Sequence, residues 1–323
     1  MAASSLTTLD ERRSVRRFLR KLKAGEEIAY LVTLGASSLV IVIVVLLVYQ
    51  LWAASILPIH KFGLSFLTGT TWDPNLGEFG ALPFIYGTCI TSFLALLIAV
   101  PTGLGAAIFL AELAPPKVSS FMTFLIELLA AVPSVIYGLL GIFILIPLMR
   151  AYLIPPLKSI FGFLPIFSGA FYGVSIFSAG IVLSIMVVPF IISVSREVLL
   201  AVHTDQREAA LALGATKWEA TWDIVIPNAR IGVIGSIFLA LARALGETMA
   251  VTMVIGNSPQ IAASLLAPGY SIAAVIANEF TEATGDLYLA SLIYLGLVLF
   301  GLTIVINAAA RILILSTERK ASA

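Results

Sequence analysis

Charged side chains are scarce in this sequence and make up only 11% of its 323 residues. Soluble globular domains carry about 25%, so a chain this poor in charge, with 60% hydrophobic residues, is not an ordinary soluble enzyme. The mean hydropathy is +1.05, and several apolar runs reach about 20 residues, the length that crosses a bilayer. These runs occupy the whole length of the chain and leave no room for a soluble catalytic domain.

Residues for redox and metal chemistry are also few. The single cysteine, Cys89, excludes an internal disulfide, and the two histidines, His60 and His203, lie far apart in different loops and suggest no metal site. The ATP-binding pattern G-x-x-x-x-G-K-[ST] is absent, which excludes ATP hydrolysis by that route. No nucleophile–base pair suggests an intramembrane enzyme, and the net charge of +1 gives no indication of nucleic acid as a partner.

The apolar runs predict an all-α polytopic membrane protein. We predict six transmembrane helices, at residues 28–57, 81–111, 119–149, 174–195, 230–256 and 287–311. A basic tail at 1–27 precedes them, and a short tail at 312–323 follows. The apolar stretch at 261–277 is broken by Pro268 and Gly269, so we interpret it as interfacial or re-entrant rather than as a seventh span.

The lysines and arginines predict the orientation. Fifteen lie on one side of the predicted spans and only Lys61, Arg150 and Lys158 lie on the other. The fifteen are Arg12, Arg13, Arg16, Arg17, Arg20, Lys21, Lys23, Lys117, Arg196, Arg207, Lys217, Arg230, Arg311, Arg319 and Lys320. Because basic residues collect on the inner side of a membrane, we expect both termini and the loop between the fourth and fifth spans to face the cytoplasm.

That loop, at residues 204–228, is polar and helical in pattern. Asp205 and Glu208 have the spacing of a capping box, and Gly214 is typical of a helix end. Thr216 and Glu219 repeat the capping-box spacing. The pattern therefore predicts a helix, a glycine elbow and a second helix.

The second helix of the elbow carries a large apolar stripe. Trp218, Trp222 and Val225 follow at spacings of four and three, which are typical of one helical face, and we expect Pro227 to end this helix. Tryptophans exposed to water are costly. They therefore either dock onto a partner or pack back onto the protein's own helix ends.

The same loop fits the pattern E-A-A-x3-G-x9-I-x-L-P with one departure, Ile226 in place of leucine. It resembles the cytoplasmic signature of the membrane subunits of ABC importers. The resemblance implies a type I ABC importer permease whose core, residues 81–311, presents the loop as a coupling helix to an ATPase subunit. The residues implied in coupling are Glu208, Ala209, Ala210, Gly214, Trp218, Ile224 and Pro227.

The family resemblance also implies partners. An ATPase dimer would carry the ATP and magnesium, so no cofactor is expected in this chain. A second permease subunit, either a related chain or a copy of this one, would complete the pore, with membrane lipid around it.

Three charges fall inside predicted spans: Arg243 and Glu247, about one turn apart on the same helical face, and Glu127 in the third span. Charges at membrane depth are costly and mark functional sites, although a helix-locking ion pair is an alternative. An arginine can hold phosphate or sulfate by two hydrogen bonds. Glu247 can accept a proton from hydrogen phosphate, whereas sulfate and molybdate carry no such proton at neutral pH.

Three further patches resemble phosphate importer permeases, of the PstC type. They are residues 241–251 (LARALGETMAV), residues 131–138 (AVPSVIYG), and the P-x-G-x-G of residues 101–105 with Glu112 after it. The resemblance implies ATP-driven import of phosphate across the inner (plasma) membrane of a prokaryote, with an external phosphate-binding protein as donor. The implied pathway residues are Arg243, Glu247, Thr248, Ser134 and Glu127.

Two alternatives stay open at this point. The same architecture can import another oxyanion, such as sulfate or molybdate. An ion-coupled carrier that needs no ATPase would require the match at residues 208–227 to be accidental.

Overall fold

The computed structural model describes residues 26–321, and within them the side chains of residues 29–309, 311 and 312. The predicted basic tail lies almost wholly outside the described residues. The chain divides after Ala54 into two units, which we describe separately. The first unit contains α2 (Glu26–Ala54), an uninterrupted helix that is apolar on all sides, as expected for a helix surrounded by lipid.

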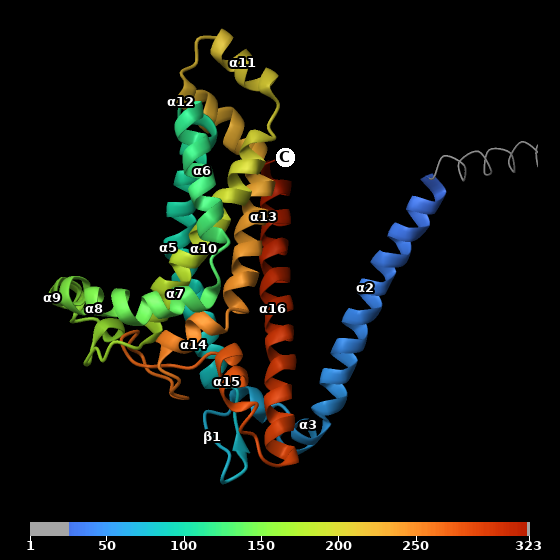
Figure 1. Cartoon of the computed structure of the whole chain (residues 1–323), viewed down its shortest axis with the longest axis vertical. Helices are drawn as coiled ribbons and strands as arrows, with labels where there is room; N and C mark the ends of the chain where they lie inside the picture. Colours follow the sequence, from blue (N-terminus) through green and yellow to red (C-terminus); the bar gives the residue numbers. More distant parts are fainter. Residues whose placement is uncertain (1–25, 322–323) are drawn as a thin grey trace, which may run out of the picture. The chain divides into compact units, whose positions relative to one another are not determined.

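The second unit is a helical bundle with a small hairpin (Figure 1). Its first elements are α3 (Ile56–Phe62), α4 (Ser65–Thr68) and the antiparallel strands β1 (Trp72–Asp73) and β2 (Glu78–Phe79), in which Trp72 pairs with Phe79. Then come α5 (Leu82–Ile108), α6 (Pro116–Ala130), α7 (Ser134–Leu140), α8 (Ile146–Leu148), α9 (Ile154–Phe161) and α10 (Ile176–Leu200). The last are α11 (Thr204–Ala212), α12 (Lys217–Glu219), α13 (Ile226–Leu245), α14 (Met249–Ile255), α15 (Ile272–Glu279) and α16 (Asp286–Ala321).

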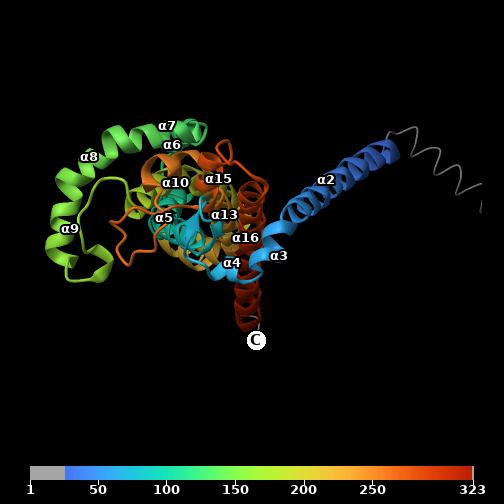
Figure 2. The same cartoon turned by 90° about the horizontal axis from the view of Figure 1, so that it is seen from below.

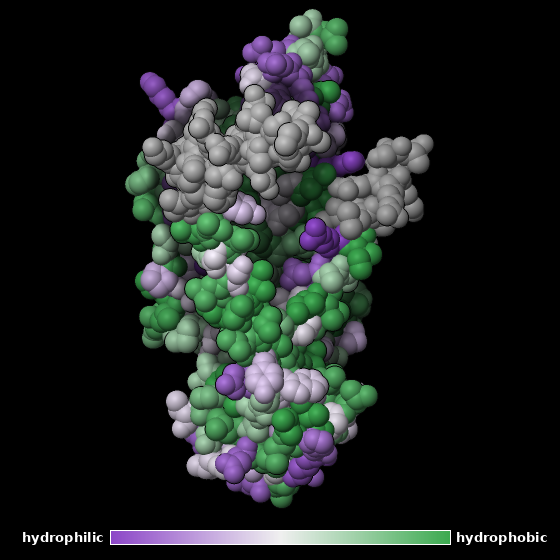
Figure 3. All heavy atoms as spheres, turned by 90° about the vertical axis from the view of Figure 1, so that its right-hand side faces the viewer, coloured by the Kyte–Doolittle hydropathy of each residue, from purple (hydrophilic) through white to green (hydrophobic). Residues whose placement is uncertain are grey.

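Six helical runs of the described residues are long and apolar enough to cross a membrane, which confirms the predicted number. They are Ala29–Ala54, Leu82–Leu113, Ser134–Phe161, Ile176–Leu200, Lys217–Leu245 and Asp286–Ala309. Some of them pass through π-helical turns, at Phe109–Leu113, Gly141–Leu145, Met149–Leu153 and Ala220–Val225. Figure 3 shows hydrophilic side chains gathered at the level of α11.

The predicted third span, 119–149, has the wrong bounds. α6 ends at Ala130, and Pro133 is extended (φ −58°, ψ 139°). The long helical run begins only at Ser134 and continues to Phe161, through a segment that we predicted as a connection. Prolines 155 and 156 follow a π-helical turn, in which the N–H of Ile154 bonds to the carbonyl of Met149, five residues back, and this wider turn leaves room for prolines that lack a donor. In Figure 2, α7 to α9 form an arm that curves away from the bundle.

The predicted fifth span, 230–256, is also wrong at both ends. The helix begins at Lys217 and runs through Pro227, which does not end it. The π-helical turn just before Pro227 explains why: the N–H of Ile226 bonds to the carbonyl of Thr221, five residues back. This wider turn leaves room for a proline that lacks its own donor. The helix then stops at Leu245, and α14 starts at Met249.

α10 is the central helix of the bundle. Of its 18-residue apolar segment, which is long enough to cross the membrane, 72% is buried. Its most extensive partner is α5. At their contact, a Cβ on Gly103 would lie 2.9 Å from the Cγ2 of Ile191. Glycine therefore lets the two helices approach closely, as in many membrane bundles.

The stretch at 261–277 forms no span, since its only helix is the eight-residue α15. The segment before α15 folds onto the first turn of α10. The carbonyls of Ala267 and Leu265 accept the N–H groups of Ile176 and Phe177 at 3.1 and 2.8 Å. Leu266 between them is fully buried, so this loop is part of the packed structure.

Candidate functional site

The elbow predicted at residues 204–228 is present, and Gly214 turns it with φ +91°. The second capping box is confirmed. Thr216 accepts the N–H of Glu219 at 3.3 Å, and the carboxylate of Glu219 accepts the N–H of Thr216 at 2.7 Å. The first is wrong, because α11 starts two residues earlier than expected and places Asp205 inside its first turn, where a carboxylate interacts with the helix dipole.

The outer surface of the elbow is apolar and open. Leu213 is 90% exposed, and Trp218 and Trp222 are 55% and 56% exposed. The two tryptophan rings stack on each other, with centroids 5.7 Å apart. Pro227 and Glu208 are exposed, and Ile224 is half-buried.

A hollow of about 630 Å³ lies between α11 and the helix that follows Gly214. Ala209 and Ala210 line it together with Gly214 and Ile224. The two alanines and the glycine leave space that larger side chains would fill. The elbow therefore offers both a hollow and an exposed apolar rim, a combination that suits a partner surface.

Arg207 of α11 fixes the elbow to the rest of the bundle, a contact that the sequence analysis did not predict. Its guanidinium donates to both oxygens of Glu112, at 2.8 and 3.2 Å, and to the carbonyls of Leu199 and Val202 at 2.6 Å each. The side chains are 18% and 9% exposed. Glu112 entered the sequence analysis only through a resemblance, and nothing in the spacing related it to Arg207.

One helical run joins the elbow to the charged residues of the fifth span. It begins at Lys217 and ends at Leu245 without a break. At 1.5 Å per residue, Trp218 and Arg243 are about 40 Å apart along it. The elbow and Arg243 are therefore joined by one continuous helix.

Arg243 and Glu247 do not share a helical face, contrary to our prediction. The helix stops at Leu245, and Glu247 lies in the break, where its carboxylate accepts the N–H of Ala250 at 3.3 Å. Arg243 is exposed, with its guanidinium 5.7 Å from the centre of the Phe190 ring. Among the described side chains, no ion pair joins Arg243 to Glu247 or Glu127.

Thr248 and Ser134 lie at corresponding positions in two broken helices. Thr248 precedes α14, and Ser134 begins α7. A Cβ on Gly138 would lie 3.2 Å from the Cα of Ala250, and one on Gly141 would lie 2.8 Å from Val254. The residue later in α7 and its continuation contacts the residue later in α14, so the two helices run in the same direction. The two breaks therefore lie at one level.

Glu127 lies apart from these residues, near the end of α6, and lines a separate pocket with Arg196 of α10. The hydroxyl of Tyr137 donates to the carbonyl of Leu129 at 2.7 Å and so joins α6 to α7. In the part of the chain that the structure describes, no three His, Cys, Asp or Glu side chains gather to hold a metal ion.

Comparison with known proteins gives one family. Residues 99–319 match the model of the binding-protein-dependent transport system inner membrane component. A phosphate transport system permease protein PstC of Mesorhizobium japonicum is 44% identical, over 94% of this chain and 94% of that protein. The PstC protein of Pasteurella multocida is 49% identical over 80% and 82%, and a probable PstC protein of Methanocaldococcus jannaschii is 35% identical over 91% and 93%.

Among solved structures, a chain of the MetNI methionine ABC transporter in inward-facing conformations is similar. Its TM-score is 0.45 at 17% identity, over 72% of this chain and 94% of that chain. A likeness of this size adds nothing to the sequence relatives.

Proposed function

This chain belongs to the family of binding-protein-dependent transport system inner membrane components, and from that premise we propose that it carries inorganic phosphate into the cytoplasm as a PstC-type permease. It is a multi-pass membrane protein, a permease subunit of an ABC transporter and not itself an enzyme. The single observation that carries the choice of phosphate is the 44% identity to a phosphate permease over nearly the full length of both chains.

The chemistry of the site agrees with this cargo. Arg243 is exposed in the isolated chain, and an arginine at membrane depth requires water or a partner. In the proposed importer, that face borders the pathway shared with a second permease subunit. Arg243 supplies two parallel donors to the oxyanion, with Glu247, Thr248 and Ser134 at or near the two breaks as further polar groups.

The elbow is proposed to receive the ATPase. Glu208, Ala209, Ala210, Gly214, Trp218, Ile224 and Pro227 form or border its open apolar surface. An ATPase dimer, which holds ATP and magnesium, would cover the exposed tryptophans and the hollow. Its movements would reach Arg243 through the unbroken helical run.

The orientation follows from the same proposal. The elbow and both termini face the cytoplasm, and the hairpin and α15 face the outside, where a phosphate-binding protein delivers the cargo. The plasma (inner) membrane of a prokaryote is the proposed location.

The function is tested with the complete importer in proteoliposomes that contain ATP. We expect phosphate uptake to depend on the binding protein and on ATP. Excess sulfate or molybdate should not inhibit this uptake. If the importer took up sulfate or molybdate in preference to phosphate, phosphate would not be the cargo. Phosphate transport by the chain without an ATPase would instead identify an ion-coupled carrier.

A further inference from the structure

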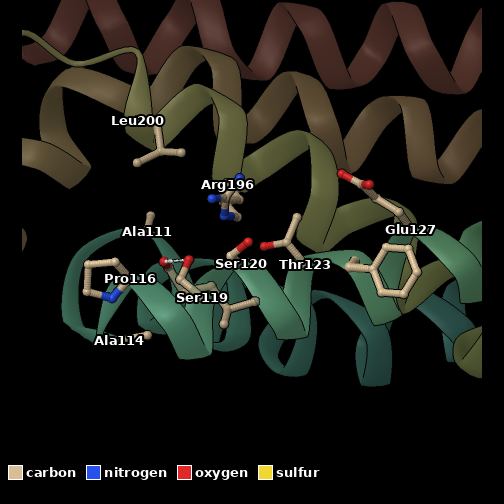
Figure 4. A pocket seen from close by; sticks show the side chains of 11 residues that line it. Ala111, Ala114, Pro116, Ser119, Ser120, Thr123, Glu127, Arg196 and Leu200 are labelled. Atoms are coloured by element: carbon tan, nitrogen blue, oxygen red, sulfur yellow. Dashed lines mark hydrogen bonds between the residues drawn. The ribbon is translucent and has the colours of Figure 1, made fainter.

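A second polar pocket lies between α6 and α10, apart from Arg243 and Glu247. Its volume is about 530 Å³, and its polar lining includes Ser120, Thr123, Glu127 and Arg196. Figure 4 shows the guanidinium of Arg196 directed from α10 toward the hydroxyls of Ser120 and Thr123 on α6. The spacings of three and four place Ser120, Thr123 and Glu127 on one face of α6.

Two groups in this pocket have unmet hydrogen-bonding capacity. The structure leaves three buried polar side-chain atoms of the described residues without a partner, and the Nε of Arg196 and the Oγ1 of Thr123 are two of them. Buried donors are costly unless they are paired. A threonine in a helix commonly bonds to its own backbone, but Thr123 does not. Almost no surface of these two atoms is exposed, so a ligand in the pocket would reach them after a small rotation of the two side chains.

The charge of Arg196 is only partly neutralised. Its NH1 group donates to Glu197 at 3.0 Å, but that carboxylate is 70% exposed, whereas the Arg196 side chain is 18% exposed. Water screens the exposed partner. The guanidinium therefore keeps unused donor capacity for an anion, and two hydroxyls lie opposite it (Figure 4).

Glu127 is a carboxylate in the lining, and a fully deprotonated anion would be repelled by it. A protonated oxyanion would instead donate its proton to Glu127 while its other oxygens accept from Arg196 and Thr123. We propose that this pocket binds free inorganic phosphate in its hydrogen phosphate form. This inference rests on the proposed function in one respect, that the protein handles phosphate.

The position of the pocket suits phosphate that has passed the membrane. Leu200 lines it, and the neighbouring carbonyl of Leu199 accepts from Arg207, which holds the elbow. The pocket thus lies at the end of the bundle that carries α11. In the proposed orientation this is the cytoplasmic end. The pocket would therefore bind phosphate on the side of the membrane where phosphate leaves the importer.

The test measures equilibrium binding of radiolabelled phosphate to the complete importer in nanodiscs of zwitterionic lipid, without ATP. The Arg243→Gln background removes the pathway site. We expect phosphate to bind in this background, at least about tenfold more weakly after Arg196→Gln and a few-fold more weakly after Thr123→Val, because a charge-assisted hydrogen bond and a neutral one are lost. Arg230→Gln, at an exposed arginine of α13, is the matched control and should change nothing.

Selectivity gives an independent readout. Sulfate should not compete for the unchanged pocket and should compete after Glu127→Gln, since the repelling carboxylate is then gone. Binding that is unaffected by Arg196→Gln would overturn the proposal. Displacement of phosphate by anionic phospholipid in the nanodisc would also overturn it, because a phosphodiester has no proton for Glu127.

Failure of this inference is separable from failure of the proposed function. An importer that moves phosphate but shows no Arg196-dependent binding retains its function and loses only the pocket. An importer that moves another oxyanion while the pocket still binds phosphate loses the function instead.

Discussion

At the scale of single residues, Arg207 and Glu112 have the clearest structural role. The guanidinium makes two bonds to one carboxylate in a site that is largely closed to water. Removal of one partner leaves the other charge buried without compensation, which costs about 3 kcal/mol or more. This pair fixes α11, and with it the angle of the elbow against the bundle.

We expect Arg207→Ala to loosen α11 and to lower the amount of ATPase subunit that co-purifies by about tenfold or more, because about 1.4 kcal/mol of the lost interaction is enough for a factor of ten in binding. Arg207→Lys should give an intermediate loss, since lysine keeps the charge but not the two-point geometry. The measurement is the ATPase-to-permease ratio after affinity purification. Arg230→Ala is the matched control, and equal ratios in all variants would refute the role of the pair.

At the scale of elements, close contacts between backbones shape the bundle. A Cβ on Gly87 of α5 would lie 2.1 Å from the carbonyl oxygen of Tyr270. A backbone atom cannot turn aside as a side chain can. The loop before α15 therefore depends on the absence of a side chain at this position of α5.

Two alanine substitutions in α5 test this contact. Gly87→Ala should lower the thermal unfolding midpoint of the purified importer by about 5 °C or more, because overpacking costs about 1–3 kcal/mol. Gly105→Ala should leave it unchanged or raise it slightly, since nothing lies within 4 Å of its Cβ position and alanine favours a helix. Equal midpoints for the two variants would contradict the packing described here.

Apolar runs predicted the number of spans and the first, second, fourth and sixth to within a few residues, because length and hydropathy decide those helices. They failed at the third and fifth. There, Pro133 and residues 246–248 break the helix inside an apolar run, while Pro227 leaves its helix intact through a π-helical turn. Whether a proline ends a helix depends on such turns, which residue types alone do not specify.

The elbow was predictable because its signals are local: Gly214 and the Thr216–Glu219 box lie within a few residues of each other. The bond from Arg207 to Glu112 and the pocket of Arg196 were not, because each joins helices that are distant in sequence. The separation of Glu247 from the face of Arg243 followed from the missed break.

At the scale of the whole molecule, the two ends of the bundle carry different structures. The elbow lies at one end, and the hairpin and α15 lie at the other (Figure 1). Each end has exposed residues, such as Leu213 on the elbow and Asn75 in the hairpin. The proposed orientation puts these two residues on opposite sides of the membrane.

Single cysteines test that orientation in a Cys89→Ala background. Leu213→Cys should react with a membrane-impermeant maleimide in inside-out vesicles of cells without the ATPase subunit, and not in right-side-out vesicles. Asn75→Cys should show the opposite pattern. The reverse result for both would place the elbow outside and would rule out a cytoplasmic ATPase as its partner.

The central claim is that ATP-driven passage of phosphate depends on Arg243. The most direct measurement is phosphate uptake into ATP-loaded proteoliposomes by the complete importer, with wild-type Arg243 or with Arg243→Gln, at equal subunit ratios. We predict that uptake falls by about 100-fold or more while the ATPase stays bound. The reason is that charge-assisted hydrogen bonds from Arg243 to the oxyanion contribute about 3 kcal/mol. Uptake at the wild-type rate by the fully assembled Arg243→Gln importer would contradict the account.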